Sequence, residues 1–170
     1  MIKGYFLGEK VISNDEESFA LCEKSVFGEK KLGKVEYASF EALYLIEQKK
    51  MEVFNGSKLM SFHDLIKKFL RFDKRVVLKF EVYKDLRNKG YIVKTALKYG
   101  ADFRVYDKGS RPGKKHSLWI LYCSNESKSL TWQEFASKNR IAHSTKKTLL
   151  LGILDEEGDI SYYEIKWFRA

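Results

Sequence analysis

A chain of 170 residues suits one large domain or two small ones, and its 44% hydrophobic and 32% charged residues are the balance of a globular protein. The formal net charge of +9 favours polyanionic partners, although a solvated, lysine-rich surface would explain it equally well. No apolar run approaches the roughly 20 residues of a membrane helix, and the N-terminus lacks the apolar core of a signal peptide. The two cysteines are far apart, so neither a disulfide framework nor a zinc site is expected. These features predict a cytoplasmic protein.

The first 37 residues alternate short apolar segments with turn signals at Ser13-Asn14-Asp15 and Gly28-Glu29, which predicts a small antiparallel sheet. A helix is expected to begin at Ser39, because the apolar residues that follow have helical spacing. A strand is then predicted at residues 51–54.

Two further helices are predicted before the middle of the chain. The first begins after Ser61, because Ser61 and Asp64 resemble a capping box. The second runs from about Val76 to Lys89, and Gly90 stands where a left-handed cap would end it. We place the domain boundary in this second helix, between an N-terminal α/β domain of residues 1–80 and a C-terminal domain of residues 81–170.

The second half alternates strands with one helix. Thr131 and Glu134 form a capping-box pattern that opens this helix, which ends near Ser144. The most apolar strand follows it and is expected to be central. Strands are predicted at residues 91–95, 102–106, 117–123, 147–154 and 160–168. The fold class is therefore α/β (α+β), with a mixed C-terminal sheet flanked by helices.

One candidate site would use a metal ion. Glu164-Ile165-Lys166 places Glu164 and Lys166 on one face of a strand, as metal-dependent nucleases require. The tripeptide is common by chance, and Asp155 and Asp159, the carboxylates closest in sequence, lie in the preceding turn.

A second candidate site needs no metal. RNA carries its own nucleophile, the 2′-hydroxyl, so an enzyme must supply a base, an acid for the leaving oxygen and a cation. An unperturbed imidazole titrates at about pH 6.5 and suits the acid. His116 lies between a basic loop and an apolar strand, where functional side chains are often displayed. His63 and His143 have no such setting.

Several ordered segments resemble the C-terminal domain of archaeal tRNA-splicing endonucleases. They are residues 83–95 and 98–106, His116-Ser117, residues 140–144, Lys146-Lys147 and residues 158–163. The resemblance covers about residues 83–170, and a weaker one extends upstream through residues 41–45 and the Ser61 helix. It implies an enzyme that cuts precursor tRNA at intron–exon junctions with bulge-helix-bulge geometry. The resemblance also implies that no metal or cofactor takes part and that the products carry 2′,3′-cyclic phosphate and 5′-hydroxyl ends.

The resemblance also implies roles for three residues. Tyr106 would act on the 2′-hydroxyl, His116 would be the general acid, and Lys147 would stabilise the transition state. A free phenol titrates at about pH 10, so Tyr106 would either take the proton or only orient the hydroxyl.

Contacts to RNA are implied as well. Arg140 corresponds to an arginine that stacks on a bulged base, and Tyr162 or Trp167 is the candidate second stacking residue. Lys115 belongs to a predicted phosphate-contacting surface with Lys98, Arg104, Lys108, Arg111 and Lys114.

The resemblance finally implies an assembly, in most members of four subunits. The acidic turn at residues 155–159 would dock into a basic groove of another subunit, and the last strand, with Tyr163, Ile165 and Trp167 on one face, would pair across a two-fold axis. The partner would be a second copy or a paralogous chain. The alternative functions are a non-enzymatic RNA-binding subunit of such a complex and a metal-dependent nuclease.

Overall fold

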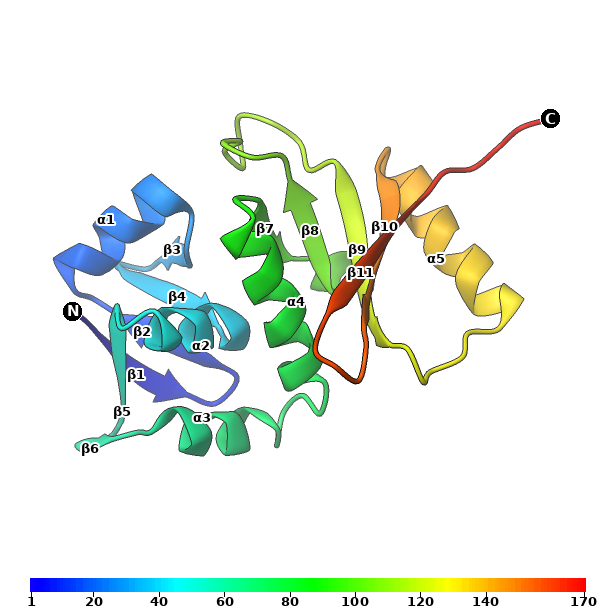
Figure 1. The fold of residues 1–170 in the computed structure, drawn as a ribbon. Coiled ribbons are helices and arrows are strands. Elements are labelled where there is room, and N and C mark those ends of the chain that lie inside the picture. Colours follow the sequence, from blue (N-terminus) through cyan, green and yellow to red (C-terminus); the bar gives the residue numbers. More distant parts are fainter. The chain divides into compact units, whose positions relative to one another are not determined.

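The computed structural model describes all 170 residues, and the chain divides into two compact units, Met1–Phe80 and Glu81–Ala170 (Figure 1). Each unit contains its own mixed sheet. No helix in either unit combines the length and the apolar character needed to cross a bilayer.

The N-terminal sheet has six strands in the order β3-β4-β2-β1-β5-β6. Their bounds are β1 Ile2–Leu7, β2 Lys10–Ser13, β3 Glu29–Lys31, β4 Lys34–Ala38, β5 Met51–Asn55 and β6 Lys58–Leu59. The antiparallel sheet predicted for residues 1–37 is confirmed, because β1, β2, β4 and β3 pair antiparallel. β5, which lies outside that range, runs parallel to β1, with Ile2 opposite Met51. Helix α2 (Ser39–Glu47) makes the crossover that a parallel pair requires.

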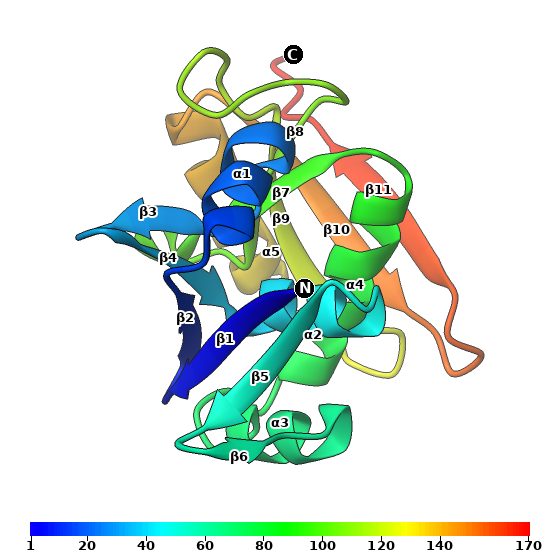
Figure 2. The same cartoon turned by 90° about the vertical axis from the view of Figure 1, so that its left-hand side faces the viewer.

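Helix α1 (Glu16–Ser25) corrects the prediction that residues 1–37 contain only strands. Asn14-Asp15 resembled a turn, but the carbonyl oxygen of Asp15 accepts the amide of Ser18 and so begins the helix. Ser18 is the only buried residue of α1, which explains the missing apolar periodicity. Figure 2 shows α1 beside β3 and β4, and the Ser18 hydroxyl lies 2.6 Å from that of Tyr37 on β4.

The predicted helix starts and ends are mostly confirmed. α2 begins at Ser39, and α3 (Phe62–Phe69) follows Ser61, whose hydroxyl accepts the Asp64 amide at 3.1 Å. α4 (Val76–Asn88) ends two residues before Gly90, which is left-handed with φ of 93° and caps the helix as predicted. α5 (Trp132–Ser144) has the complete capping box of Thr131 and Glu134.

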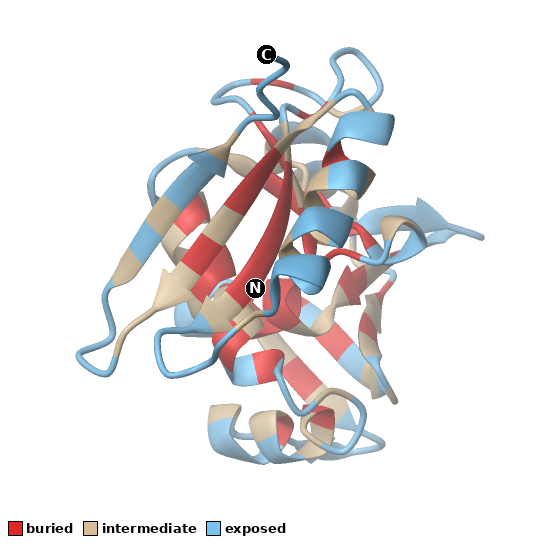
Figure 3. Ribbon diagram, turned by 90° about the vertical axis from the view of Figure 1, so that its right-hand side faces the viewer, coloured by how far each residue is buried: buried red, intermediate tan, exposed pale blue.

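The C-terminal sheet has five strands in the order β11-β10-β9-β8-β7. They are β7 Ile92–Thr95, β8 Phe103–Tyr106, β9 Trp119–Asn125, β10 Thr148–Leu154 and β11 Ile160–Ile165, with a short 3-10 helix, η1, at Leu97–Tyr99. β9 and β10 are parallel and joined through α5, and the other pairs are antiparallel. The middle strand is β9, so the expectation that the residue 147–154 strand is central is wrong by one place. The last strand stops at Ile165 rather than Phe168, and the tail that follows it is exposed (Figure 3).

Candidate active site

Three neighbouring strands of the C-terminal sheet bring Tyr106, His116 and Lys147 to one end of that sheet. Tyr106 is the last residue of β8, while His116 and Lys147 lie just before β9 and β10. β8 is antiparallel to β9, and β9 is parallel to β10, so the C-terminal end of β8 meets the N-terminal ends of the other two. Trp119 is opposite both Val105 and Thr148 in this register. The loop that joins β8 to β9 covers this end of the sheet (Figure 1).

The backbone of Leu118 ties these strand ends together. Its amide donates to the carbonyl oxygen of Val105 at 2.9 Å, and its carbonyl oxygen accepts the amide of Thr148 at 3.0 Å. Each bond lies one residue from Tyr106 or Lys147 in the chain, and Leu118 lies two residues from His116. Sequence patterns did not identify Leu118, because it contributes only backbone atoms.

The end of α5 positions Lys147. The amide of Lys147 donates to the carbonyl oxygen of Ala142 at 2.9 Å, and the amide of Lys146 donates to that of His143 at 3.0 Å. These two bonds form a Schellman motif, with Lys146 in the left-handed conformation at φ of 57°. The Lys147 ammonium lies 3.5 Å from the carbonyl oxygen of Thr145, at the negative end of the helix. A rigid turn therefore fixes the backbone from which Lys147 extends.

Tyr106 has a buried ring, with only 5% of the residue exposed. Its hydroxyl has no hydrogen bond within the chain, yet it is not among the fully buried unpaired oxygens. A phenol that is anchored by its ring and reaches solvent at its oxygen can interact with a bound substrate.

His116 is exposed and has no side-chain partner within the protein. The loop before it, residues 107–115, carries four lysine or arginine side chains. The amides of Lys114 and Lys115 donate to the carbonyl oxygen of Arg111, and the chain turns at Gly109 and Gly113. Ser117, the next residue, is buried with an unpaired hydroxyl, a feature that the sequence did not indicate. His116 is thus free to approach a ligand from a basic loop.

The residues expected to contact RNA fall into separate groups. Lys115 lies in the basic loop, and Arg140 is exposed on α5, four residues before the helix ends beside Lys147. Lys98, in contrast, lies on η1 at the opposite end of the sheet, and the Arg104 guanidinium donates to the carbonyl oxygen of Thr95 at 2.9 Å. The predicted phosphate surface is therefore divided, and only the loop part of it adjoins His116.

Tyr162 lies on β11, opposite Gly152 of β10. Its hydroxyl donates to the Asp85 carboxylate at 2.7 Å, and Lys89 lies above its ring at 5.4 Å. Burial, followed by the bond to Asp85, raises the pKa of Tyr162. Asp85 belongs to α4 and Lys89 follows the last residue of that helix, so the tyrosine links α4 to the sheet in addition to any contact it makes with RNA.

The remaining candidates have simpler surroundings. Trp167 packs edge-on against His143 at 4.5 Å. Glu164 and Lys166, from the tripeptide of the metal-site alternative, form an exposed ion pair at 3.8 Å where the edge strand ends. No group of three histidine, cysteine or acidic side chains is arranged to hold a metal ion.

The acidic turn between β10 and β11 lies at the end of the sheet opposite His116. The Asp155 carboxylate accepts the amides of Glu157 and Asp159, each at 2.9 Å. The Glu126 carboxylate, from the loop after β9, accepts the Glu156 amide at 2.9 Å. Glu126 extends the acidic turn, although its position in the sequence gave no sign of this.

Two family models match the chain. The tRNA intron endonuclease N-terminal domain matches residues 2–66, and the tRNA intron endonuclease catalytic C-terminal domain matches residues 76–162. The chain is 39% identical to a tRNA-splicing endonuclease of Nanoarchaeum equitans, with 96% of this chain and 97% of the relative covered. It is 36% identical to that of Pyrococcus furiosus over 99% and 98% of the two chains, and 37% identical to that of Methanothermobacter thermautotrophicus over 96% of each.

Proposed function

Because the chain belongs to the tRNA intron endonuclease family, we propose that it cuts precursor tRNA at intron–exon junctions of bulge-helix-bulge geometry. The reaction is an attack of the ribose 2′-oxygen on the adjacent phosphorus, with departure of the 5′-oxygen. It leaves a 2′,3′-cyclic phosphate on one fragment and a 5′-hydroxyl on the other, and uses no metal ion. The observation that supports it is the meeting of Tyr106, His116 and Lys147 at one end of one sheet.

His116 protonates the leaving 5′-oxygen in this reaction. Its imidazole is exposed and has no internal partner, so it can reach the leaving group from the basic loop. General acid catalysis of this kind contributes roughly 10²- to 10⁴-fold to a rate.

Lys147 stabilises the negative charge that develops on the phosphorane oxygens. A cation held by a rigid helix end needs little reorganisation as this charge appears, which is the condition for strong electrostatic catalysis.

Tyr106 contacts the 2′-hydroxyl, either as the base or as a hydrogen-bond partner that orients it. The buried ring fixes where its oxygen lies, and a lysine such as Lys147 beside it would favour the phenolate. A Tyr106→Phe enzyme tests whether the hydroxyl takes part at all, because near-normal single-turnover cleavage would rule out both roles.

RNA contacts come from the same end of the sheet. Arg140 stacks its planar guanidinium on a bulged base, and Lys115 contacts a phosphate. Tyr162 is the proposed second stacking residue, supplied by another subunit. Its half-buried position and its bond to Asp85 leave one ring face at most for a base.

The active enzyme is an assembly of four subunits, either identical or of two related kinds. The acidic turn of residues 155–159, extended by Glu126, docks into a basic groove of a neighbouring subunit. The edge strand β11 pairs with its equivalent, because Tyr163 on it is exposed and its outer backbone groups have no partner strand.

The test is incubation of the purified protein, alone and in EDTA, with an intron-containing tRNA precursor, followed by end-group analysis. We expect an excised intron with cyclic phosphate and 5′-hydroxyl ends, and His116→Ala serves as the control for a contaminating nuclease. Cleavage that EDTA abolishes would favour the metal-dependent alternative. No cleavage until a second chain is added would favour the non-enzymatic subunit.

A further inference from the structure

Positive charge in the N-terminal unit is concentrated in its last third. Residues 57–80 contain seven lysines and arginines against two acidic residues, whereas residues 1–56 contain eight against ten. None of the residues proposed for the reaction lies in this stretch, so the cationic stretch needs an explanation of its own.

The stretch lines a hollow of about 310 Å³ between the β5–β6 hairpin and α3, which lie side by side in Figure 2. Lys58 enters from the hairpin, and Lys67, Lys68 and Arg71 enter from the end of α3. Asn55 adds an amide, and Met60, which is buried, contributes an apolar wall. We call this hollow the α3 basic pocket.

Little in the protein neutralises the α3 basic pocket. Of the two acidic residues in the stretch, Asp73 is engaged by the Lys79 ammonium at 2.7 Å and by the Arg75 amide at 2.9 Å. Asp64 is the single carboxylate that lines the pocket. Lys58, Lys67 and Arg71 form no ion pair, and all three are exposed.

We propose that the α3 basic pocket binds backbone phosphates of the precursor tRNA outside the cleavage junction. Three unpaired cations and an amide are donors suited to phosphodiester oxygens, and the arginine fork can take two oxygens at once. The volume is several times the about 30 Å³ that one water occupies, so a phosphate group fits. The inference rests on the proposed tRNA substrate and assigns the N-terminal unit a share in holding it.

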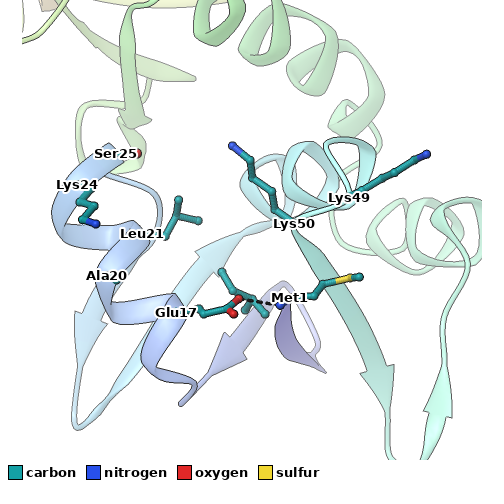
Figure 4. Close-up of a pocket in the computed structure, with 9 residues that line it drawn as sticks. Met1, Glu17, Ala20, Leu21, Lys24, Ser25, Lys49 and Lys50 are labelled. Carbon is teal, nitrogen blue, oxygen red and sulfur yellow. Dashed lines mark ion pairs between the residues drawn. The ribbon is translucent and has the colours of Figure 1, made fainter.

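A second hollow in the same unit shows what a less suitable arrangement looks like. It measures about 430 Å³ and lies between α1 and the start of β1. The amino group of Met1 pairs with Glu17 at 2.8 Å, and the side chains of Lys49 and Lys50 diverge (Figure 4). Its lysines do not converge on one ligand, so this hollow supplies a matched control.

The experiment compares two triple variants of the full-length protein. Lys58→Gln, Lys67→Gln and Arg71→Gln together empty the α3 basic pocket of its unpaired cations, while Lys24→Gln, Lys49→Gln and Lys50→Gln remove the same charge from the control hollow. The probe is a precursor tRNA made uncleavable by 2′-deoxy substitution at both junctions. Its affinity is measured at several salt concentrations.

Each lost phosphate contact lowers the slope of log affinity against log salt by about 0.7 to 0.9. We expect the pocket variant to lose about 2 to 3 in slope and the control variant to lose nothing. A short RNA that contains only the junction should bind both variants like the wild type. Arg71→Gln alone should lose about 1 in slope, which keeps the test available if the triple variant misfolds.

Equal slopes for the wild type and both Arg71→Gln and the pocket variant would overturn the inference. So would a pocket variant that binds normally but sediments as a smaller species, because the pocket would then hold the acidic turn of another subunit. Binding to the uncleavable RNA does not depend on catalysis, so it distinguishes this failure from failure of the proposed reaction.

Discussion

The two ends of the C-terminal sheet carry opposite charges. At the end of the sheet that carries His116, cations come from the β8–β9 loop, from Lys147 and from Arg140 in the last turns of α5; we call this the cationic end. At the other end, which we call the acidic end, the β10–β11 turn carries Asp155, Glu156, Glu157 and Asp159 beside Glu126. The sheet therefore separates a surface suited to RNA from a surface that would repel it.

The ends also differ in how their side chains are satisfied. At the acidic end the carboxylates of Asp155 and Glu126 accept backbone amides and fix the shape of the turn. At the cationic end, Tyr106 and His116 make no side-chain hydrogen bond within the chain. A preformed turn suits docking to another protein, whereas unsatisfied groups suit a substrate that completes them.

The largest expected effect is at the cationic end. Lys147→Ala should lower the single-turnover cleavage rate by about 10²- to 10³-fold, by analogy with the removal of one oxyanion donor. The ammonium contacts only the Thr145 carbonyl oxygen within the chain, so the thermal midpoint should hardly change. Rapid-quench kinetics at saturating RNA measure the rate.

Lys146→Ala is the control for this substitution, because it removes a neighbouring charge that is not proposed to contact the phosphate. An equal loss of rate in both variants would mean that general charge, and not the position of Lys147, matters at this end.

Substitutions at the acidic end should change the assembly of subunits before they change the rate of the chemical step. Glu156→Lys with Glu157→Lys reverses the charge of a turn that is proposed to enter a basic groove, and like charges in such a contact cost several kcal/mol. We expect sedimentation velocity to show a smaller species, with lower activity at dilute enzyme concentration. Glu9→Lys with Glu16→Lys makes the same charge change at exposed positions of the N-terminal unit. An unchanged sedimentation profile of the turn variant would contradict the docking role.

The sequence predicted local structure well wherever a side chain caps an element or a period is strong. The Thr131–Glu134 box and Gly90 fixed the ends of two helices. It failed at α1, whose single buried residue is a serine, because burial of a hydrogen-bonded hydroxyl produces no apolar pattern.

The residues of the candidate site stay a prediction, and the backbone that holds them could not be predicted from the sequence. Only the resemblance pointed to Tyr106 and Lys147, since neither residue type in isolation marks a site. The Leu118 backbone bonds and the engagement of Glu126 with the turn depend on which strands neighbour each other. Strand order is set by long-range pairing, which a local pattern does not encode.

A smaller effect, on stability, should distinguish the structural role of the Tyr162 hydroxyl from the proposed stacking of its ring. Tyr162→Phe keeps the ring and removes the bond to Asp85, which should cost about 1 kcal/mol at neutral pH, because Asp85 remains paired with Lys89 at 2.5 Å. Cleavage should persist, since phenylalanine stacks as well. Denaturant unfolding and the cleavage assay measure the two properties.

The same substitution should change the dependence of stability on pH above 10. Burial raises the pKa of Tyr37 to about 12 and raises the pKa of Tyr162 further. Below about pH 10 these phenols are protonated in both states and add no pH dependence. Above it the unfolded chain releases protons that the folded chain keeps, so stability falls by up to about 1.4 kcal/mol per pH unit for each phenol. Tyr162→Phe should make this decline shallower, while Tyr163→Phe, at the exposed neighbouring position, should leave it as in the wild type.

The smallest effect concerns the turn that presents Lys147 at the cationic end. α4 and α5 end in the same motif, but α4 has Gly90 at its left-handed position and α5 has Lys146. A side chain in this conformation is strained by roughly 1–2 kcal/mol, and glycine removes the strain at some cost in chain entropy. Lys146→Gly should therefore raise the free energy of unfolding by about 0.5–1 kcal/mol, measured by urea denaturation, and leave the cleavage rate unchanged. Gly90→Ala is the reverse change in the same motif and should destabilise. If Lys146→Gly stabilised the protein but slowed cleavage, the strained turn would itself help to hold Lys147 in its working position.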